Sequence, residues 1–376
     1  MKVGVIGCGG MGLHHAEVLR KLDMVDEVVC CDLGEAQRGK AQEKGLRALV
    51  TVEEVLAEKP GAVFVVTAPA AHAECIRKCL AKGVPVFTEK PLASTLAESR
   101  ELVEAAEKKG IPFQVGFEMR YGGMVRGMRE IVDSGAIGEP RHMSLVQISG
   151  LSAKAGYMTR ERTGGIFYEK LCHQIDFYRY WFGEPERICA VAPPIVHRHY
   201  GIEDHVLSYL RFPGGRAGMI TFITSRAANI GRGAEGDAKI DHEVRGHYYE
   251  MILTCSRGSV SYDAWTGTIE VIRYNHREDN KSELIDSIEV LPRWGEPAYA
   301  LTEQNGDFLR RISAGKPPQF PASDALKSME WVERAEESLR RGGEWISAEY
   351  EAGGSRRRGA RKPSRPPGRS RRKGKG

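Results

Sequence analysis

The first third of the chain alternates short apolar runs with amphipathic stretches. Five runs rich in Val, Ile and Phe have the length and composition of buried strands. Buried strands that alternate with helices predict a doubly wound parallel sheet, whose ligands bind at the carboxyl ends of the strands. The five runs lie at residues 2–7, 26–32, 61–69, 84–90 and 111–117. Helices are expected at 13–22, 70–83 and 94–110, the last one starting at a cap formed by Ser94.

The regular alternation ends near residue 119. One helix is expected at 124–135, and two more at 300–314 and 323–341, the last beginning at a Ser-Asp cap. Between them, strand-like stretches are separated by turns such as PGG, SRG and TG. Strands followed by helices around one chain predict an α+β domain. These stretches lie at residues 141–150, 186–196, 204–212, 217–225, 250–264 and 268–275.

A glycine motif follows directly on the first apolar run. Gly7, Gly9 and Gly12 fit G-x-G-x-x-G, and the second run ends in Asp32, twenty residues after Gly12. Strand, motif, helix, strand and acid in this order indicate a dinucleotide site in a Rossmann fold. Gly7 permits a tight turn, Gly9 lets the main chain approach a pyrophosphate, and Gly12 lets the helix pack on the strand. The N-terminus of the helix then faces the phosphates.

The acid at the end of the second strand indicates which dinucleotide binds. Asp32 can accept hydrogen bonds from both ribose hydroxyls and would repel a 2′-phosphate. Leu33 and Gly34 follow it, so no Arg stands directly beside it to bind that phosphate. We therefore expect NAD rather than NADP.

Composition and charge describe a globular body with a basic end. Hydrophobic residues make up 41% and charged residues 28%, and no apolar run is long enough for a membrane span. Eight scattered cysteines without metal-finger spacing read as reduced thiols, which favours the cytoplasm. Residues 355–376 hold eleven of the 55 Lys and Arg residues and no acid, which leaves 44 basic against 50 acidic residues elsewhere. We expect a disordered tail that either binds nucleic acid or only aids solubility.

Several motifs resemble the Gfo/Idh/MocA family, the glucose–fructose oxidoreductases, inositol dehydrogenases and their relatives. They are GCGGMG, Asp32, APAAH and above all TEKPLA, and the resemblance runs from residue 2 to about 345. It implies oxidation or reduction of a carbon of a sugar, polyol or related compound with NAD or NADP. It also implies a second domain with a large open, mostly antiparallel sheet, which carries the substrate site and commonly mediates oligomers.

The resemblance assigns the central chemistry to two residues. Lys90 of TEKPLA matches the active-site lysine, which stabilises negative charge on the reacting oxygen. His173, in a helix expected after the paired glycines at 164–165, matches the histidine that moves the proton. Two other hypotheses stay open: a glycosidase that oxidises its sugar transiently with tightly held NAD, and a non-catalytic NAD-binding regulator.

The helix around His173 departs from the family pattern. The residue four before the histidine is Asp in many relatives but Glu169 here, and Lys170 follows it. We take Glu169 as a third catalytic residue, because a carboxylate on the helix can orient the imidazole, and Asp176 can hold the helix or ring. In helical geometry these residues share a face, whereas Lys170 points about 100° away from Glu169. The added charge suits a bulkier, acidic or glycosylated substrate.

The remaining candidates lie at strand ends and in loops. HRHYGIEDH, with His197 and His199, matches no common metal motif, and we expect no metal site. We divide the chain into an NAD-binding Rossmann domain (1–118), an α+β substrate-binding and oligomerisation domain (119–350) and the disordered basic tail (351–376). The expected cofactor contacts are Gly7, Gly9, Gly10, Met11, Gly12, Asp32, Thr67, Ala68, Pro69, His72, Glu89 and Lys90. The expected substrate contacts are Arg120, Tyr157 and Lys170.

Overall fold

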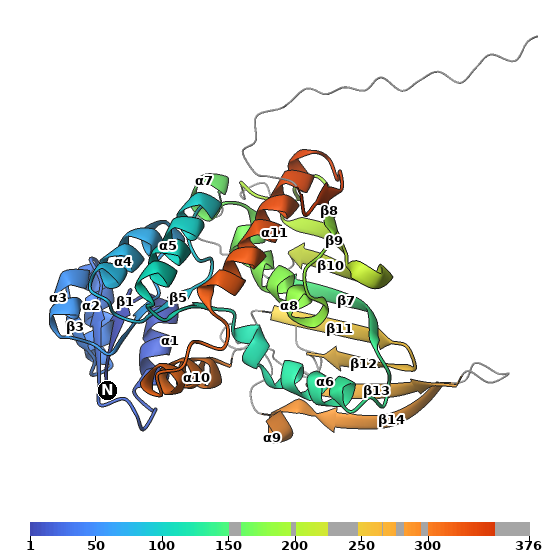
Figure 1. Cartoon of the computed structure of the whole chain (residues 1–376), viewed down its shortest axis with the longest axis horizontal. Helices are drawn as coiled ribbons and strands as arrows, with labels where there is room; N and C mark the ends of the chain where they lie inside the picture. The colour runs from blue at the N-terminus through green and yellow to red at the C-terminus, as the bar shows by residue number, and fades with distance from the viewer. Residues whose placement is uncertain are drawn as a thin grey trace, which may run out of the picture.

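The computed structural model contains two sheets that lie side by side (Figure 1). It describes residues 1–149, 159–196, 201–224, 247–264, 266–275, 282–294 and 300–349. The expected basic tail, the loop with His197 and His199, and the candidate Tyr157 lie outside these residues. Within them, no helix is long and apolar enough to cross a membrane.

The first sheet is parallel, with strand order β3-β2-β1-β4-β5-β6. This is the doubly wound order in which a ligand crevice opens at the carboxyl ends, between β1 and β4. The strands are nearly continuous apolar runs because helices bury both faces of the sheet. The strands are β1 (Lys2–Ile6), β2 (Glu27–Cys31), β3 (Arg47–Leu49), β4 (Ala62–Val65), β5 (Val86–Glu89) and β6 (Phe113–Gly116).

Helices cover the two faces of this sheet in separate groups. The helices on one face are α1 (Gly10–Leu19) and α2 (Glu35–Glu43). The helices on the other face are α3 (Val52–Ala57), α4 (Pro69–Ala81) and α5 (Leu96–Lys109). The cap of α5 is Thr95, whose side chain accepts a hydrogen bond from the backbone N–H of Glu98 at 3.2 Å. The expected cap at Ser94 was therefore wrong by one residue, since Thr and Ser serve equally as caps.

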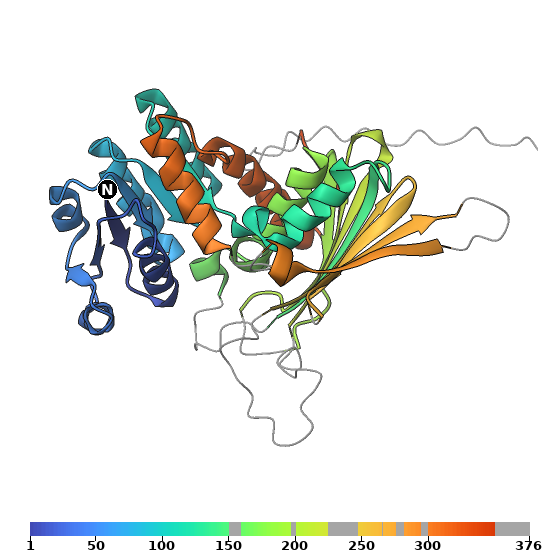
Figure 2. The same ribbon diagram turned by 90° about the horizontal axis from the view of Figure 1, so that it is seen from below.

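The second sheet is mostly antiparallel, as the family resemblance implied. Its order is β14-β13-β12-β11-β7-β10-β9-β8-β15, and only β7 and β10 pair in parallel among the described strands. Figure 2 shows described helices on one face of this sheet and none on the other. The strands are β7 (Pro140–Ser149), β8 (Arg187–Val191), β9 (His205–Arg211), β10 (Ala217–Thr224), β11 (His247–Cys255), β12 (Gly258–Asp263), β13 (Thr268–Tyr274), β14 (Ser282–Glu289) and β15 (Ile346–Ser347).

Seven described helical segments connect the sheets or cover the second one. They include η1 (Glu118–Tyr121), a 3₁₀ turn directly after β6, and α6 (Gly123–Asp133). A π-helical turn, η2 (Phe167–Leu171), runs straight into α8 (Cys172–Phe182). The short helices α7 (Arg160–Thr163), η3 (Pro213–Gly215) and α9 (Val290–Trp294) complete the described part of this region.

The last two helices return to the first sheet. Phe308 of α10 (Leu301–Ser313) is fully buried, with its ring centroid 5.8 Å from those of Phe64 and Phe87. α11 (Ala322–Arg340) packs against α5 on one side and against α8 on the other. It begins at Ala322 after Pro321, so the expected Ser-Asp cap lies inside its first turn. α11 therefore joins the two sheets, whereas α10 packs on the first sheet.

Candidate active site

The glycine turn between β1 and α1 has the geometry that its spacing predicts. Gly7 has a φ of +105°, and a Cβ there would lie 2.5 Å from the main-chain oxygen of Val66. A Cβ at Gly12 would lie 1.9 Å from the main-chain oxygen of Gly7, so this close approach of helix to strand excludes every side chain. A Cβ at Gly9 or Gly10 would meet no described atom within 4 Å. The space beside the helix N-terminus is therefore open to a pyrophosphate.

Asp32 lies at the end of β2, beside the same turn. Its two carboxylate oxygens accept hydrogen bonds from the backbone N–H groups of Cys8 and Gly34, both at 2.8 Å. The side chain of Arg38 reaches this corner from α2 and donates to the main-chain oxygens of Asp32 and Leu33, at 2.8 and 2.9 Å. The carboxylate is thus held in a fixed orientation at the end of β2, and the guanidinium of Arg38 is bound to the main chain of the same corner.

A groove of about 640 Å³ runs between Asp32 and the start of α4. Thr67 and Ala68 line it, and Pro69 is the first residue of α4. His72 does not line it: the side chain is fully buried, with Nδ1 2.8 Å from the oxygen of Pro91 and Nε2 3.1 Å from that of Thr67. Burial lowers the pKa of this imidazole. His72 was expected to contact the cofactor, but its imidazole instead links the main chain after β4 to that after β5.

The end of β5 is anchored by a buried pair that the sequence analysis missed. Glu89 is 7% exposed, and its Oε1 lies 3.0 Å from Nε2 of His15 in α1. The other ring nitrogen of His15 lies 3.0 Å from the side-chain nitrogen of Asn305 in α10. Burial alone would raise the pKa of Glu89, but His15 and the neighbouring Lys90 lower it. Glu89 thus stays a carboxylate and ties the lysine strand to the cofactor helix.

Lys90 and His173 face one cavity of about 180 Å³, next to Met11 of the glycine turn. The lysine comes from the end of β5 and the histidine from α8, so the two catalytic candidates converge from different sheets. The remaining lining comes from both sheets and from α10. The described residues that line the cavity are Met11, Glu89, Lys90, Glu118, Gln147, Lys170, His173, Tyr249 and Leu301.

Lys90 is held by the helix that carries the histidine. Its Nζ donates a hydrogen bond to the main-chain oxygen of Glu169 at 3.1 Å. Burial alone would lower the pKa of Lys90, but the acidic groups around it, Glu169 and Glu89 among them, raise it. Lys90 is therefore a cation at neutral pH.

Glu118, not a residue of the same helix, is the carboxylate that faces the ring of His173. Nδ1 of His173 lies 3.5 Å from Oε2 of Glu118, and the ring packs edge-on against Phe117 at 5.7 Å. Glu118 is 7% exposed, and burial, together with the nearby Glu89, raises the pKa of Glu118 to about 8. Glu118 and His173 are far apart in the sequence, so their pairing required the tertiary structure.

The residues just before His173 form a π-helical turn, in which Lys170 and Glu169 have different roles. Lys170 lines the cavity, whereas Glu169 contributes its main-chain oxygen to Lys90 and is not among the lining residues. The expectation that Glu169 shares the functional face and that Lys170 turns away is thus reversed. Lys170 is three residues before His173, and residues at this spacing share one face of a helix, so the 100° between Lys170 and Glu169 does not turn Lys170 away from His173.

The start of this turn is fixed by the last helix. A Cβ at Gly165, whose φ is +121°, would lie 2.3 Å from a carboxylate oxygen of Glu336. The same carboxylate accepts a hydrogen bond from the backbone N–H of Phe167 at 2.9 Å. Glu336 is 1% exposed and belongs to α11, so it acts as a buried N-terminal partner for the helix that carries His173.

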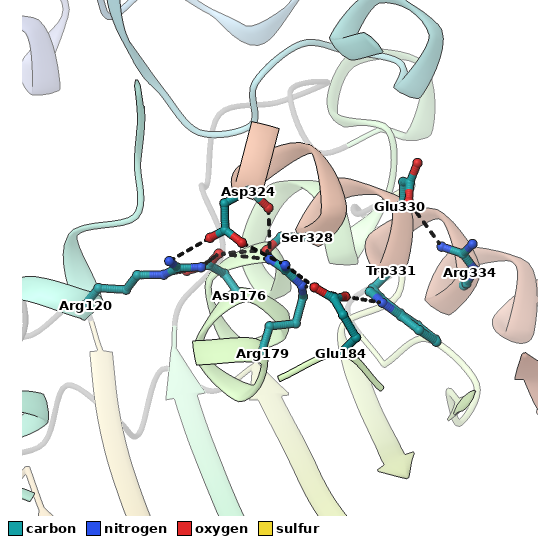
Figure 3. Close-up of polar contacts among 9 residues, drawn as sticks. All are labelled: Arg120, Asp176, Arg179, Glu184, Asp324, Ser328, Glu330, Trp331 and Arg334. Atoms are coloured by element: carbon teal, nitrogen blue, oxygen red, sulfur yellow. Dashed lines mark hydrogen bonds and ion pairs between the residues drawn. The ribbon is translucent and has the colours of Figure 1, made fainter. Parts of the chain in front are cut away.

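Arg120, expected to bind substrate, belongs to a buried ion cluster instead. Its guanidinium donates two hydrogen bonds of 2.6 Å to Asp176, pairs with Asp324 at 2.8 Å, and lies over the ring of Phe320. Ser328 donates a further hydrogen bond to Asp176 at 2.7 Å. Figure 3 shows these side chains pointing toward one another between α8 and α11. Asp176 thus holds its helix, not the ring of His173, and Arg120 has a structural role.

Two further polar side chains complete the cavity wall on the second sheet. The side-chain nitrogen of Gln147 donates to the hydroxyl of Tyr249 at 3.2 Å, and Gln174 donates to the oxygen of Gln147 at 2.6 Å. Strand alternation places Gln147 on the helix-covered face, but which strand faces the cavity was not readable from the sequence. In the described part of the chain, no group of three or more His, Cys, Asp or Glu side chains is gathered as a metal site.

Comparisons with known proteins agree with this architecture. A family model described as oxidoreductase family, NAD-binding Rossmann fold, matches residues 1–117, and a GFO/IDH/MocA C-terminal domain matches residues 125–261. Myo-inositol 2-dehydrogenase of Thermotoga maritima is 27% identical over 346 residues, covering 90% of this chain and 96% of the relative. scyllo-Inositol 2-dehydrogenase (NAD(+)) of Bacillus subtilis is 28% identical over 357 residues, covering 91% and 95%.

A solved structure extends the similarity to the fold. An oxidoreductase from Agrobacterium radiobacter, in complex with NAD+, L-tartaric acid and magnesium, has a TM-score of 0.75 at 20% identity, over 92% of this chain and 98% of that chain. The two family models together span most of both sheets and include the glycine turn, Lys90 and His173. The chain belongs to the Gfo/Idh/MocA family of NAD-binding oxidoreductases.

Proposed function

We propose that the protein is an NAD-dependent dehydrogenase that transfers hydride between the nicotinamide and a carbon of a sugar, polyol or glycoside. The observation that carries this proposal is the meeting of Lys90 and His173 in one cavity beside the glycine turn. The two inositol dehydrogenases that match over nine tenths of the chain support a substrate rich in hydroxyl groups.

Lys90 and His173 divide the work on the substrate oxygen in this proposal. NAD, when bound, supplies the nicotinamide ring that accepts or returns the hydride. As the substrate C–H bond breaks, the proton of the adjacent hydroxyl passes to Nε2 of His173 and the oxygen becomes a carbonyl. The permanently charged Lys90 stabilises the negative charge on that oxygen during the transfer. Glu118 faces the other ring nitrogen and positions the imidazole.

The fit of the cofactor groove supports NAD as the cofactor. Gly9 and Gly10 leave space at the helix N-terminus, and Asp32 presents a carboxylate to the ribose. A 2′-phosphate on that ribose would approach this carboxylate and be repelled, while Arg38 already binds main-chain oxygens behind it. We expect kcat/KM with NAD to exceed that with NADP at least tenfold, and Asp32→Ser to reduce the ratio. Equal use of both cofactors by the wild type would refute the assignment.

The face of the second sheet that no described helix covers supports a homo-oligomer. Apolar side chains of β8, β9 and β11 are exposed there: Val191 (38%), Leu207 (41%), Tyr209 (47%) and Ile252 (38%). The strand register places Leu207 opposite Val191, which makes them neighbours on one surface. An apolar surface of this kind indicates a protein interface, and a second copy buries it symmetrically. Leu207→Glu with Tyr209→Glu should lower the mass measured by light scattering, whereas Leu291→Glu on α9 should not.

The eight cysteines also bear on the cellular location. All are unpaired, and seven of them are buried. Unpaired thiols in this number support a reducing compartment such as the cytoplasm.

Turnover is tested by following NADH absorbance with a panel of sugars, polyols and their keto forms. Lys90→Ala and His173→Ala should each lower kcat by about 10²–10⁴-fold, with NADH binding retained. Either variant with full turnover would refute its assigned role. Release of an aglycone from a glycoside without NADH accumulation would identify the glycosidase alternative, and NAD binding without any turnover would identify the regulator.

A further inference from the structure

Lys170 is a cation without a partner in the proposed catalytic cavity. It is half-buried and lines the cavity together with Lys90, His173 and Glu118. Among the described residues, no side chain forms a hydrogen bond or ion pair with its ammonium. Lys90, in contrast, is anchored by its bond to the oxygen of Glu169. An ammonium that is partly withdrawn from water and forms no ion pair is costly, so the presence of Lys170 in the cavity calls for an explanation.

The charges around Lys170 do not supply the missing anion. Glu89 is paired with His15 and accepts a hydrogen bond from the backbone N–H of Lys90 at 3.2 Å, so its carboxylate already has partners other than Lys170. Glu118 is buried, and its pKa of about 8 keeps it largely uncharged at neutral pH. Burial, followed by repulsion from Lys90, lowers the pKa of Lys170 to about 8, and the neighbouring carboxylate of Glu169, which forms no ion pair with the ammonium, offsets this only in part. The cavity therefore holds an excess of positive charge below pH 8.

Resting on the proposed function, we propose that the substrate is a sugar acid or related hydroxy acid, and that Lys170 binds its carboxylate. The position fits this role, because Lys170 is three residues before His173 and lines the same cavity as Lys90. The reacting hydroxyl then lies between Lys90 and His173, with the carboxylate beside it on Lys170. The un-ionised carboxyl of Glu118 can donate a hydrogen bond to the substrate, which a charged Glu118 could not.

A carboxylate fits better than a phosphate. A phosphate at neutral pH carries close to two charges and needs several donors, commonly from a planar guanidinium or a helix N-terminus. Arg120 is committed to its ion cluster, and among the described residues that line the cavity Lys90 and Lys170 are the cations besides His173. One ammonium and one neutral carboxyl match a single carboxylate.

The experiment compares ligand pairs that differ in one group, D-glucuronate with D-glucose and D-gluconate with sorbitol. Binding to the NADH-loaded full chain is measured by calorimetry, and turnover by NADH absorbance. The wild type should bind or turn over the acid of at least one pair about tenfold better than its neutral partner. Lys170→Met and Lys170→Gln should remove this preference, Lys170→Arg should keep part of it, and Lys82→Met on the exposed end of α4 should leave it unchanged.

The outcomes separate this proposal from the proposed function. Acid binding that depends on Lys170, without oxidation of any compound, would support the carboxylate site and contradict the dehydrogenase. Oxidation of neutral compounds with no preference for either acid in the wild type would overturn the carboxylate site and leave the dehydrogenase standing. A preference that persists in both Lys170→Met and Lys170→Gln, or a sugar phosphate that binds more tightly than every acid, would also overturn it.

Discussion

Replacing Glu118 by Gln should stabilise the fold, and by more as the pH rises. In the folded protein, burial and the nearby Glu89 raise the pKa of Glu118 from 4.5 to about 8. Between these two values the folded state binds a proton that the unfolded state has lost, so the stability of the wild type falls as the pH rises. Above pH 8 both states are ionised and the loss is complete. A glutamine carries no charge and escapes the whole effect.

The magnitude follows from the displacement of the pKa of Glu118. At about 1.4 kcal/mol for each tenfold change in proton affinity, a shift from 4.5 to about 8 corresponds to about 5 kcal/mol at most. Relaxation of the site and entry of water reduce this value, and we expect an advantage of at least about 1–2 kcal/mol for Glu118→Gln above pH 8. Near pH 4.5 the advantage should vanish.

The assay is thermal unfolding of the NAD-free protein across this pH range. The difference in Tm between Glu118→Gln and the wild type should grow from pH 5 to pH 8 and then level off. Glu104→Gln, on the exposed side of α5, is the matched control and should show no such growth. A difference that is constant with pH, or that shrinks as the pH rises, would refute the reasoning about Glu118.

Three further substitutions test the packing around the site. Gly12→Ala places a Cβ 1.9 Å from the main-chain oxygen of Gly7, so NADH affinity and Tm should both fall; unchanged affinity would contradict the close-approach argument. Arg120→Met leaves Asp176 buried without its main cation and should cost about 3–5 kcal/mol in unfolding free energy, measured in urea; a loss below about 1 kcal/mol would show that the cluster is dispensable. Gly165→Ala meets a buried carboxylate of α11 at a positive φ, so kcat should fall more than NADH affinity.

The fold of the first sheet was largely readable from local pattern. Strands buried on both faces have continuous apolar sequences, and the expected apolar runs contain β1, β2, β4, β5 and β6. The short strand β3 and helices α2 and α3 were not predicted, because residues 33–60 are strongly polar and carry weak periodicity. The edge strands β14 and β15 were missed for a related reason, since edge strands have few buried positions.

In the candidate site too, local features could be predicted from the sequence, whereas contacts between distant residues could not. Gly7, Gly9 and Gly12 sit in one local turn, so their spacing alone was enough to predict their geometry. His15 and Glu89 are 74 residues apart and meet only because α1 packs against the sheet that ends in Glu89. No periodicity in a single sequence records such a pairing.

The helix with His173 has features of both kinds, some predicted from the sequence and some not. Its existence and its histidine follow from the sequence, but its start packs at Gly165 against a buried carboxylate of α11, and the cavity that Lys170 lines forms between separate segments. Likewise, Arg120 at a strand end was expected to bind substrate. Its guanidinium instead binds the carboxylate of Asp176, because the packing of α8 and α11 places this carboxylate beside it.

The sequence by itself determined the Rossmann turn, the acid at the end of the second strand, the two sheets and the family. These features are short in range, because the backbone geometry of a turn and the burial of a strand act on neighbouring residues. Only the tertiary structure decided which charges share the cavity: Lys90, Glu118, Lys170 and His173 come from three separate segments. Their protonation depends on burial and on distances between those segments, and both quantities arise only when the chain has folded.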